Sequence, residues 1–556
     1  MSEYDPVTLG ILWDKLISIA DEIYNTFCRT SFTPLVREAF DAVSVIFDGR
    51  GRLLAQCAYG PPSFIGTLPL TLQHFLQKYP RESLVPGDVM TTNDPWMGTG
   101  HLNDITMIMP VFRKDELVAF TGTVNHLPDV GGSTLSAAAR EVYEEGLRIP
   151  PAKIVKGGEL NDELFEFIRY NVRIVDSVIG DLKSAITTNM VGGDLLIEFL
   201  DEYSVEDFGS LSEAIISRSE EVMREKIREV PNGLYNYEFY IEGVKDPIKI
   251  ACSLEVRDDE ITVDFDGTDK AVDIGINVPM IYTNAYTKYG VKCVISPTLP
   301  NNDGSFKPVE ILAPEGSILN AQPPAPVAAR QITGHYTPIA VFWALSKVIP
   351  EKVLAGTGLF NSVQFASEGD GRGYSLPLFM GGGLGARSDD DGVNTLSFPT
   401  NVSSISYEVF EDFCLNSLLF EKRELITDSA GPGKYRGGFG QEILVRNLSS
   451  KPIQVAFKMR NTEFQAEGLY GGMAGAEAAC FINEQEVHPK KRYIVESGGA
   501  VKVRMGGGGG FYDPNTRDIQ MVVEDVRNGY VSLDAAKKYY GVEVDLSTWK
   551  ARRIAE

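Results

Sequence analysis

Apolar residues at helical spacing, followed by alternating runs, predict a long helix and then strands near the N-terminus. Asp5-Pro6 is a typical helix start, and a stripe of apolar residues recurs after it: Leu12, Leu16, Ile19, Ile23 and Phe27. The β-prone runs 43–48 and 52–56 flank a Gly-Arg-Gly turn and predict a hairpin. A second amphipathic helix is expected at 68–79 and a strand at 88–92.

A longer hairpin is predicted next. Residues 105–112 and 117–125 are apolar and β-prone, and the charged residues 113–116 form a short connection between them. Folding the chain about this connection places Asp104 opposite residue 125 and Asn103 opposite His126.

The two ends of this hairpin carry the first indication of chemistry. The chain has only five histidines, and two of them begin an H-x-x-D motif: His101 with Asp104, and His126 with Asp129. In the predicted register His101 and His126 share a face, with Cβ atoms about 7–8 Å apart, so one metal ion could bind both. Asp104 and Asp129 then point to the other face and are candidates for orienting a histidine or moving a proton. A register shift of one residue would reverse these faces.

The remaining polar candidates are weaker. Residues 134–151 are expected to form a wall or lid of the site, where function and solvated helix charge are equally good explanations for Arg140, Glu144, Glu145 and Arg148. His74 lies in the second predicted helix, and packing or solvent exposure explains it better than metal binding. His335 lies where a later helix begins and is a minor candidate.

The character of the chain changes near residue 230. Helical patterns dominate 162–228, whereas alternating runs after Pro231-Asn232-Gly233 predict strands. The predicted fold class is α+β, with several domains. They are an N-terminal α/β region with the metal site (1–160), a helical segment (161–230), a β-rich region with glycine-rich loops (231–515) and a C-terminal helix-strand tail (516–556).

Three glycine-rich stretches, 380–392, 428–440 and 505–514, lie in the β-rich region. None is a P-loop, because Lys434 is followed by Tyr435 where a nucleotide-binding loop needs Ser or Thr. None opens a strand-turn-helix unit with the dinucleotide fingerprint. Binding of an anionic group by backbone amides and tight packing of the main chain explain them equally well.

Composition and charge narrow the class of protein. The chain has 556 residues, 43% of them hydrophobic, and a net charge of −24, which argues against binding to nucleic acid or anionic membranes. The six cysteines are scattered, as in a cytoplasmic protein with reduced thiols. Neither an export signal nor a membrane-spanning run is predicted.

Motifs along almost the whole chain resemble, in the same order, those of the hydantoinase B/oxoprolinase family. They are NDPWMGTGHLNDIT, NHLPDVGG, EGLRIPP, DFDGT with INVP, DSAGPGKYRGG, the late GGGGG run and DAAKKYYGV. The family contains subunits of ATP-dependent hydantoinases and lactamases, a region of oxoprolinases, and subunits of acetone and acetophenone carboxylases.

The resemblance implies a divalent metal held by one aspartate and two histidines, which correspond here to Asp41, His101 and His126. Such a set suits manganese, zinc or iron. The chain departs from the family pattern at two places. Gly100 precedes His101 where family members often have Thr or Ser, and residues 101–104 read HLND where family members often have HLPD. The substrate contacts near Asn103 therefore cannot be inferred.

The resemblance also implies a partner. Family members work in hetero-oligomers with an actin-like, hydantoinase A-type ATPase subunit that uses ATP and Mg to phosphorylate a small-molecule substrate, so this chain is expected to be inactive alone. The first hypothesis is hydrolysis of a phosphorylated cyclic amide, with Asp104 or Asp129 as the proton acceptor. The alternatives are a subunit of an ATP-dependent ketone carboxylase and a non-catalytic scaffold subunit.

Overall fold

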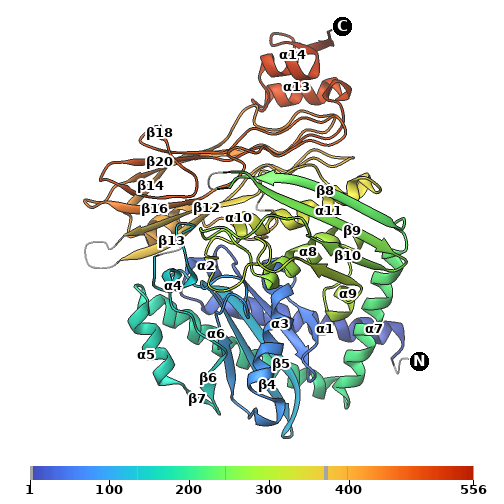
Figure 1. Ribbon diagram of the computed structural model, residues 1–556, viewed down its shortest axis with the longest axis vertical. Coiled ribbons are helices and arrows are strands. Elements are labelled where there is room, and N and C mark those ends of the chain that lie inside the picture. The colour runs from blue at the N-terminus through green and yellow to red at the C-terminus, as the bar shows by residue number, and fades with distance from the viewer. Residues whose placement is uncertain (1–3, 134–135, 244–245, 368–372, 397, 555–556) are drawn as a thin grey trace. The chain divides into compact units, whose positions relative to one another are not determined.

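The computed structural model in Figure 1 describes residues 4–133, 136–243, 246–367, 373–396 and 398–554. Helices and strands are mixed along the chain, as the predicted α+β class requires. The chain forms two compact units: unit 1 contains 1–236, 252–341 and 401–405, and unit 2 contains 237–251, 342–400 and 406–556. The helices of 161–230 belong to the same unit as the N-terminal region.

Unit 1 is built on a seven-stranded sheet of order β2-β1-β5-β4-β3-β6-β7, in which every pair is antiparallel. The predicted strand at 88–92 and both predicted hairpins are present in it. Its strands are β1 Ala42–Asp48, β2 Leu53–Gln56, β3 Val89–Thr92, β4 Asp104–Arg113, β5 Glu116–His126, β6 Ala152–Lys156 and β7 Glu159–Leu160.

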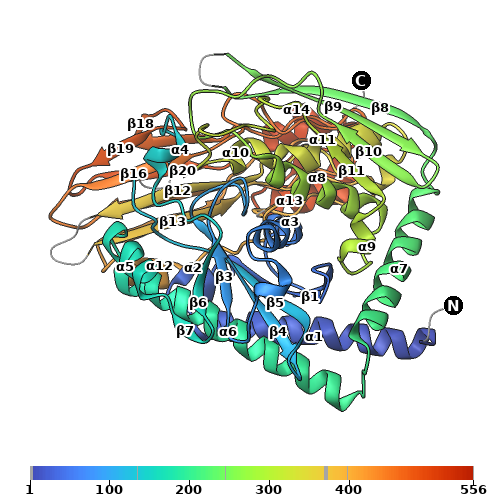
Figure 2. The same ribbon diagram turned by 60° about the horizontal axis from the view of Figure 1, so that its bottom comes forward.

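Helices cover both faces of this sheet (Figure 2). α1 (Pro6–Thr30) and α6 (Val175–Glu202) lie on one face, where the Ser44 hydroxyl donates to Ala20 O at 2.5 Å and the Thr121 hydroxyl to Asn189 O at 3.1 Å. α3 (Pro62–Lys78) lies on the other face. It begins six residues before the predicted start at 68, because Pro62 occupies the first helical position, where its missing N–H costs nothing.

The predicted helical segment 162–228 is confirmed as three helices, α5 Asp162–Asn171, α6 and α7 Phe208–Ile227. Short helices α2 (Pro34–Arg37) and α4 (Val142–Glu145) precede them. A second sheet, of order β11-β10-β9-β8, follows with its helices. These elements are β8 Gly233–Ile241, β9 Ile248–Arg257, β10 Glu260–Asp264, α8 Met280–Ile295, α9 Asp303–Phe306, β11 Val309–Leu312, α10 Gln331–Gly334 and α11 Tyr336–Ser346. The division between the units crosses β8, β9 and α11.

Unit 2 contains two further sheets, of orders β13-β12-β16-β19 and β14-β15-β20-β17-β18, and ends in two helices and a small hairpin. Its elements are β12 Phe360–Ser367, β13 Tyr374–Gly381, α12 Tyr407–Phe413, β14 Leu418–Leu425, β15 Gln441–Asn447, β16 Ile453–Lys458, β17 Ala479–Ile482, β18 Gln485–Glu486, β19 Arg492–Val495, β20 Ala500–Arg504, α13 Ile519–Arg527, α14 Leu533–Tyr540, β21 Val542–Asp545 and β22 Lys550–Arg553.

The three glycine-rich stretches of unit 2 are hydrogen-bonded to one another through their backbones. Gly383 N donates to Gly506 O at 3.0 Å, and Gly508 N donates to Gly438 O at 3.0 Å. A Cβ atom added to Gly437 would lie 1.8 Å from Gly508 O, so no side chain fits there. Tight packing of the main chain therefore accounts for these glycines.

All six cysteines are free thiols, as their scattered spacing predicts. Among the described parts of the chain, no helix has both the length and the apolar character needed to cross a membrane.

Candidate metal centre

The ends of three neighbouring strands bring one histidine and two aspartates into a row. β4 and β5 pair Asp104 directly with His126. β1 and β5 pair Ala42 with Asn125, so Asp41 occupies the next position, and His126 N donates to Asp41 O at 3.1 Å. Directly opposed residues of antiparallel strands point to the same face. Asp41 and Asp104 therefore flank His126 on the sheet.

The predicted register is wrong by one residue at this end of the hairpin, and a β-bulge is the reason. Next to the turn, Phe112 pairs with Leu117 as predicted, but beyond the bulge Val111 pairs with Ala119. The extra residue, Val118, shifts every later pair. Asp104 consequently faces His126, whereas the prediction placed its side chain on the other face.

The two histidines meet at the Asp104 carboxylate. His101 lies in the turn before β4, and its Nε2 is 2.7 Å from Asp104 Oδ1. His126 Nδ1 is 2.7 Å from the same oxygen, and the two imidazole rings are 5.2 Å apart. All three side chains are buried, and their potential ligand atoms lie within 4.8 Å of one another. The prediction that the hairpin brings His101 and His126 together is confirmed.

The other oxygen of Asp104 is held by residues that the sequence analysis missed. Thr99 Oγ1 and Arg330 Nη2 each donate to Asp104 Oδ2 at 2.6 Å. Arg330 Nε also donates to Thr99 O at 2.7 Å, and the guanidinium group lies 4.2 Å from the ring centre of Tyr282. Arg330 is 226 residues from Asp104 in the chain, and no motif in the sequence connects them.

The electrostatics of this cluster favour a neutral imidazole beside an ionised carboxylate. Burial alone would raise the pKa of Asp104, but His101 and Arg330 outweigh it and hold that pKa well below its usual range. Burial, with Arg330 next, lowers the pKa of His101 to about 4. These protonation states are the ones that bind a metal cation. Burial raises the pKa of Asp41, against the opposing effect of His126.

The donor atoms fit a divalent cation. When His101 Nδ1 carries the proton it donates to Ala328 O, 3.2 Å away, and the Nε2 lone pair then faces the Asp104 carboxylate. Within the described structure, this buried Nε2 forms no well-directed hydrogen bond. A cation that binds both atoms would remove the repulsion between this lone pair and the carboxylate 2.7 Å away, and two imidazoles with a carboxylate suit manganese, zinc or iron.

Asp129, the other predicted proton acceptor, has different partners. Arg173 Nη1 donates to Asp129 Oδ1 at 2.6 Å, and the backbone N–H groups of Gly131 and Arg173 donate to the same carboxylate. This aspartate therefore anchors Arg173, and its part in proton transfer stays a prediction.

The predicted wall segment is described except for residues 134 and 135, which lie outside the described residues. Arg140 and Glu144 are exposed, whereas Arg148 forms an ion pair with Asp94 at 2.6 Å. Glu145 is buried and accepts hydrogen bonds from backbone N–H groups.

The two minor histidine candidates lie on helices or at a helix end. His74 is half-buried on α3. His335 is buried against the rings of Tyr282 and Tyr286, with ring centres 6.3 and 5.0 Å away, and Tyr282 is also the ring that the Arg330 guanidinium group contacts.

The residues of this centre lie in a region of the chain that matches a known protein family. The sequence profile of the hydantoinase B/oxoprolinase family matches residues 5–514. The chain belongs to this family. The resemblance seen in the motifs is thereby confirmed, and the candidate metal centre lies within the matched region of the hydantoinase B/oxoprolinase chain.

Three relatives match over nearly their full length. An uncharacterized protein of Methanocaldococcus jannaschii is 31% identical over 551 residues, covering 97% of this chain and 96% of the relative. A protein of a Pseudomonas strain, named as the B-type subunit of a D-/L-hydantoinase, is 28% identical, with 98% and 96% covered. The beta subunit of the caprolactamase of Pseudomonas jessenii is also 28% identical, with 98% and 97% covered.

Two solved structures share the fold of this chain. The ATP-dependent caprolactamase of Pseudomonas jessenii matches with a TM-score of 0.89 and 27% identity, covering 98% of both chains. Nucleotide-free acetone carboxylase matches with a TM-score of 0.90 and 19% identity, covering 99% of this chain and 81% of the other. The similarity to acetone carboxylase shows a shared fold and nothing more.

Proposed function

We propose that this chain carries the divalent-metal site of an ATP-dependent cyclic-amide hydrolase and acts with a separate subunit that phosphorylates the substrate. The observation that carries the proposal is the buried cluster of His101, Asp104 and His126, in which a carboxylate faces two imidazoles. The names of two relatives, one a hydantoinase component and the other a caprolactamase component, support cyclic amides as substrates and a partner subunit.

His101 and His126 would hold the cation together with a carboxylate. Asp104 is the carboxylate that the structure places against both imidazoles, and Asp41, which the family resemblance favours as the ligand, lies on the other side of His126. A divalent cation bound here supplies Lewis acidity and lowers the pKa of a coordinated water molecule.

The two aspartates differ in a way that suits different tasks. Arg330 holds Asp104 in its ionised form, which is the form a ligand needs. Asp41 lies beside His126 but is not among the residues whose ligand atoms lie within 4.8 Å of one another, so it is available as a proton acceptor at the edge of the cluster. We therefore assign ligation to Asp104 and proton transfer to Asp41.

The partner's phosphorylation would overcome the resonance of the amide. Transfer of the γ-phosphoryl group of ATP to the amide oxygen gives an imidate-like phosphate and ADP. Addition of one water molecule to the ring carbon, followed by cleavage of the C–N bond, gives an acyl phosphate and the free amine. A second water molecule then releases phosphate and leaves the carboxylate. In this chain, Asp41 would accept the proton of the attacking water.

The site residues can be tested by metal content. Elemental analysis of the purified chain should find close to one equivalent of manganese, zinc or iron, and His101→Ala, His126→Ala and Asp104→Asn should lose it while remaining folded by circular dichroism. Asp41→Asn should keep the metal but lose turnover with the partner. If Asp41→Asn loses the metal and Asp104→Asn keeps it, the assigned roles of the two aspartates are reversed.

The reaction can be tested by reconstitution with the partner ATPase subunit. Turnover of lactams or hydantoins that depends on ATP supports the hydrolase. Consumption of a ketone and bicarbonate instead would identify a carboxylase. Acetone carboxylase, which shares only the fold with this chain, has such an activity. A wild-type chain that binds no metal even after reconstitution would favour a scaffold subunit.

A further inference from the structure

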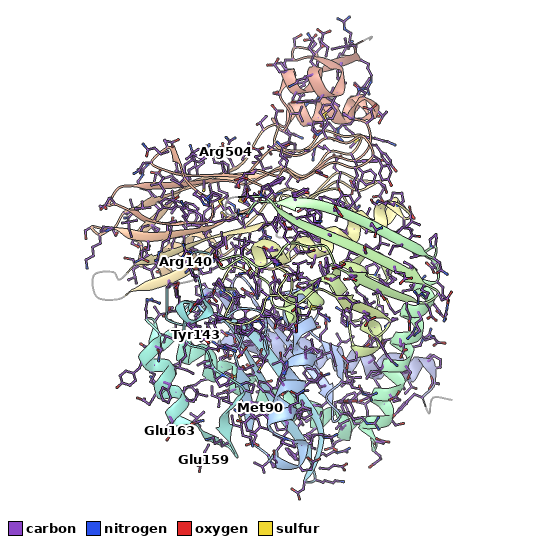
Figure 3. The ribbon with its side chains drawn as sticks, in the orientation of Figure 1. Met90, Arg140, Tyr143, Glu159, Glu163 and Arg504 are labelled. Atoms are coloured by element: carbon purple, nitrogen blue, oxygen red, sulfur yellow. The ribbon has the colours of Figure 1, made fainter. Side chains whose placement is uncertain are left out.

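Glu145 is a buried carboxyl group outside the ligand cluster. It ends the short helix α4, and its side chain is turned inward with only 3% exposure. On the same helix Tyr143, marked in Figure 3, is 71% exposed. Glu145 Oε1 accepts hydrogen bonds from two consecutive backbone N–H groups, those of Val327 at 2.6 Å and Ala328 at 2.8 Å.

A buried carboxyl group is costly unless hydrogen bonds compensate for the lost hydration. The two backbone donors satisfy Oε1, whereas the buried Oε2 forms no hydrogen bond with any described residue. An apolar side chain at position 145 would avoid this cost but would leave two backbone N–H groups unpaired. Glu145 therefore acts on the segment that contains Val327 and Ala328, whose backbone N–H groups it binds.

That segment makes two contacts with the candidate metal centre. Ala328 O lies 3.2 Å from His101 Nδ1. Two residues later, Arg330 donates to Asp104 Oδ2 and to Thr99 O. Arg330 N donates to Val327 O at 3.0 Å, so residues 327–330 form one closed turn. Glu145 binds the start of the turn, and the turn contacts His101 and Asp104.

We propose that Glu145 is a positioning residue for His101 and acts through Ala328. By accepting from the Val327 and Ala328 amides, Glu145 fixes the direction of the Ala328 carbonyl group, and this carbonyl orients the imidazole so that Nε2 faces Asp104. A histidine that binds a metal usually donates its other N–H group to such an acceptor, which sets both the tautomer and the ring orientation. This inference rests on the proposed function, because it takes His101 to be a ligand.

The first test measures metal affinity in variants of the full-length chain. Mn²⁺ is titrated into metal-stripped wild type and the variants Glu145→Leu and Glu145→Gln. The Leu variant should bind Mn²⁺ about tenfold more weakly or worse, as is typical when such a partner is lost. The Gln variant keeps an oxygen acceptor and should bind within about twofold of wild type. Unchanged affinity in the Leu variant would overturn the inference.

Glu242 provides a matched control. Its side chain is 1% exposed, and its Oε1 accepts from the consecutive N–H groups of Thr462 and Glu463 at 2.6 and 3.2 Å. It belongs to unit 2, whereas His101, Asp104 and His126 belong to unit 1. Glu242→Leu should therefore lose stability and keep its Mn²⁺ affinity. An equal loss of affinity in this variant would show that the effect at Glu145 is only structural.

A second measurement needs no metal, so it separates failure of this inference from failure of the proposed function. Imidazole ¹⁵N spectra of the metal-free chain, with the His101 signals assigned through His101→Gln, should show the same single His101 tautomer in wild type and Glu145→Gln. Glu145→Leu should show a mixture of tautomers. Glu145→Asp, too short to reach both amides, should show the same direction of change if the Leu variant does not fold. Identical spectra in all folded variants would overturn the inference.

Discussion

Arg330 and Asp104 form a buried ion pair in which Arg330 Nη2 lies 2.6 Å from Asp104 Oδ2, and both side chains are at most 5% exposed. The opposite oxygen of the same carboxylate lies 2.7 Å from His101 Nε2 and from His126 Nδ1. One guanidinium group therefore stabilises the charge of a carboxylate that two imidazoles share.

Replacing Arg330 by Met should destabilise the fold by roughly 3–5 kcal/mol, because it leaves the Asp104 carboxylate buried without its cation. Urea unfolding at neutral pH measures the change in the free energy of unfolding. The double variant Arg330→Met with Asp104→Asn removes the unpaired charge and should recover part of the loss. If the double variant is as unstable as the sum of the two single variants, the pair is not coupled as described.

Glu145 should make the stability of the chain depend on pH. Burial raises its pKa from 4.5 to about 8, against the N–H groups of Ala328 and Val327 and the charge of Arg330, while Glu144 adds to the rise. The folded state then binds more protons than the unfolded state between these values. Stability conferred by the neutral form is fully present below pH 4.5 and is lost as the pH rises through 8.

Glu145→Gln cannot titrate, so its stability relative to wild type should increase between pH 4.5 and 8, by at most about 5 kcal/mol. Thermal or urea unfolding of both proteins across this range measures the difference. A difference that does not change with pH would show that Glu145 has an ordinary pKa.

Asp129→Asn should weaken the fold without changing metal affinity. The carboxylate of Asp129 binds the side chain and the backbone N–H group of Arg173, and it is not among the residues of the candidate metal cluster. A loss of roughly 1–3 kcal/mol is expected, as for a hydrogen bond to a charged group. Metal titration checks the affinity, and Arg173→Met serves as the matched removal of the other partner. If Asp129→Asn lost the metal but kept its stability, Asp129 would belong to the metal site.

Gly437→Ala should be severely destabilising, by more than about 4 kcal/mol, because the added Cβ would lie 1.8 Å from Gly508 O. Gly10 is the matched control: it lies within α1, and a Cβ added there meets nothing within 4 Å. Gly10→Ala should stabilise the chain by about 1 kcal/mol through helix propensity. Calorimetric melting of both variants measures the contrast. Similar melting temperatures for Gly437→Ala and wild type would contradict the described packing.

The periodicity of the sequence predicted the elements near the site because their patterns are local. The first helix, the two hairpins and the strand at 88–92 all depend on residues that are neighbours in the chain. The same local reasoning brought His101 and His126 together, since a short charged connection leaves a hairpin few other ways to fold. Asp41 came from the family resemblance, and the structure places it beside His126.

Two features could not be predicted, for different physical reasons. The β-bulge at Val111 depends on how side chains pack along the strands, and its single extra residue decided which face carries Asp104. Arg330 contacts Asp104 across 226 residues, and an arginine in a segment rich in Pro and Ala gives no sign of burial. Contacts that depend on tertiary packing leave no periodic signal in one sequence.

The interlocked glycine stretches of unit 2 affect how the protein responds to temperature. Their close contacts bury peptide groups where an ordinary core buries hydrocarbon, as between Gly383 and Gly506. Exposing polar groups on unfolding lowers the heat capacity, whereas exposing apolar groups raises it. Scanning calorimetry should therefore find a heat-capacity increment below the usual 12–15 cal/mol/K per residue or so. A stability curve flattened in this way changes slowly with temperature.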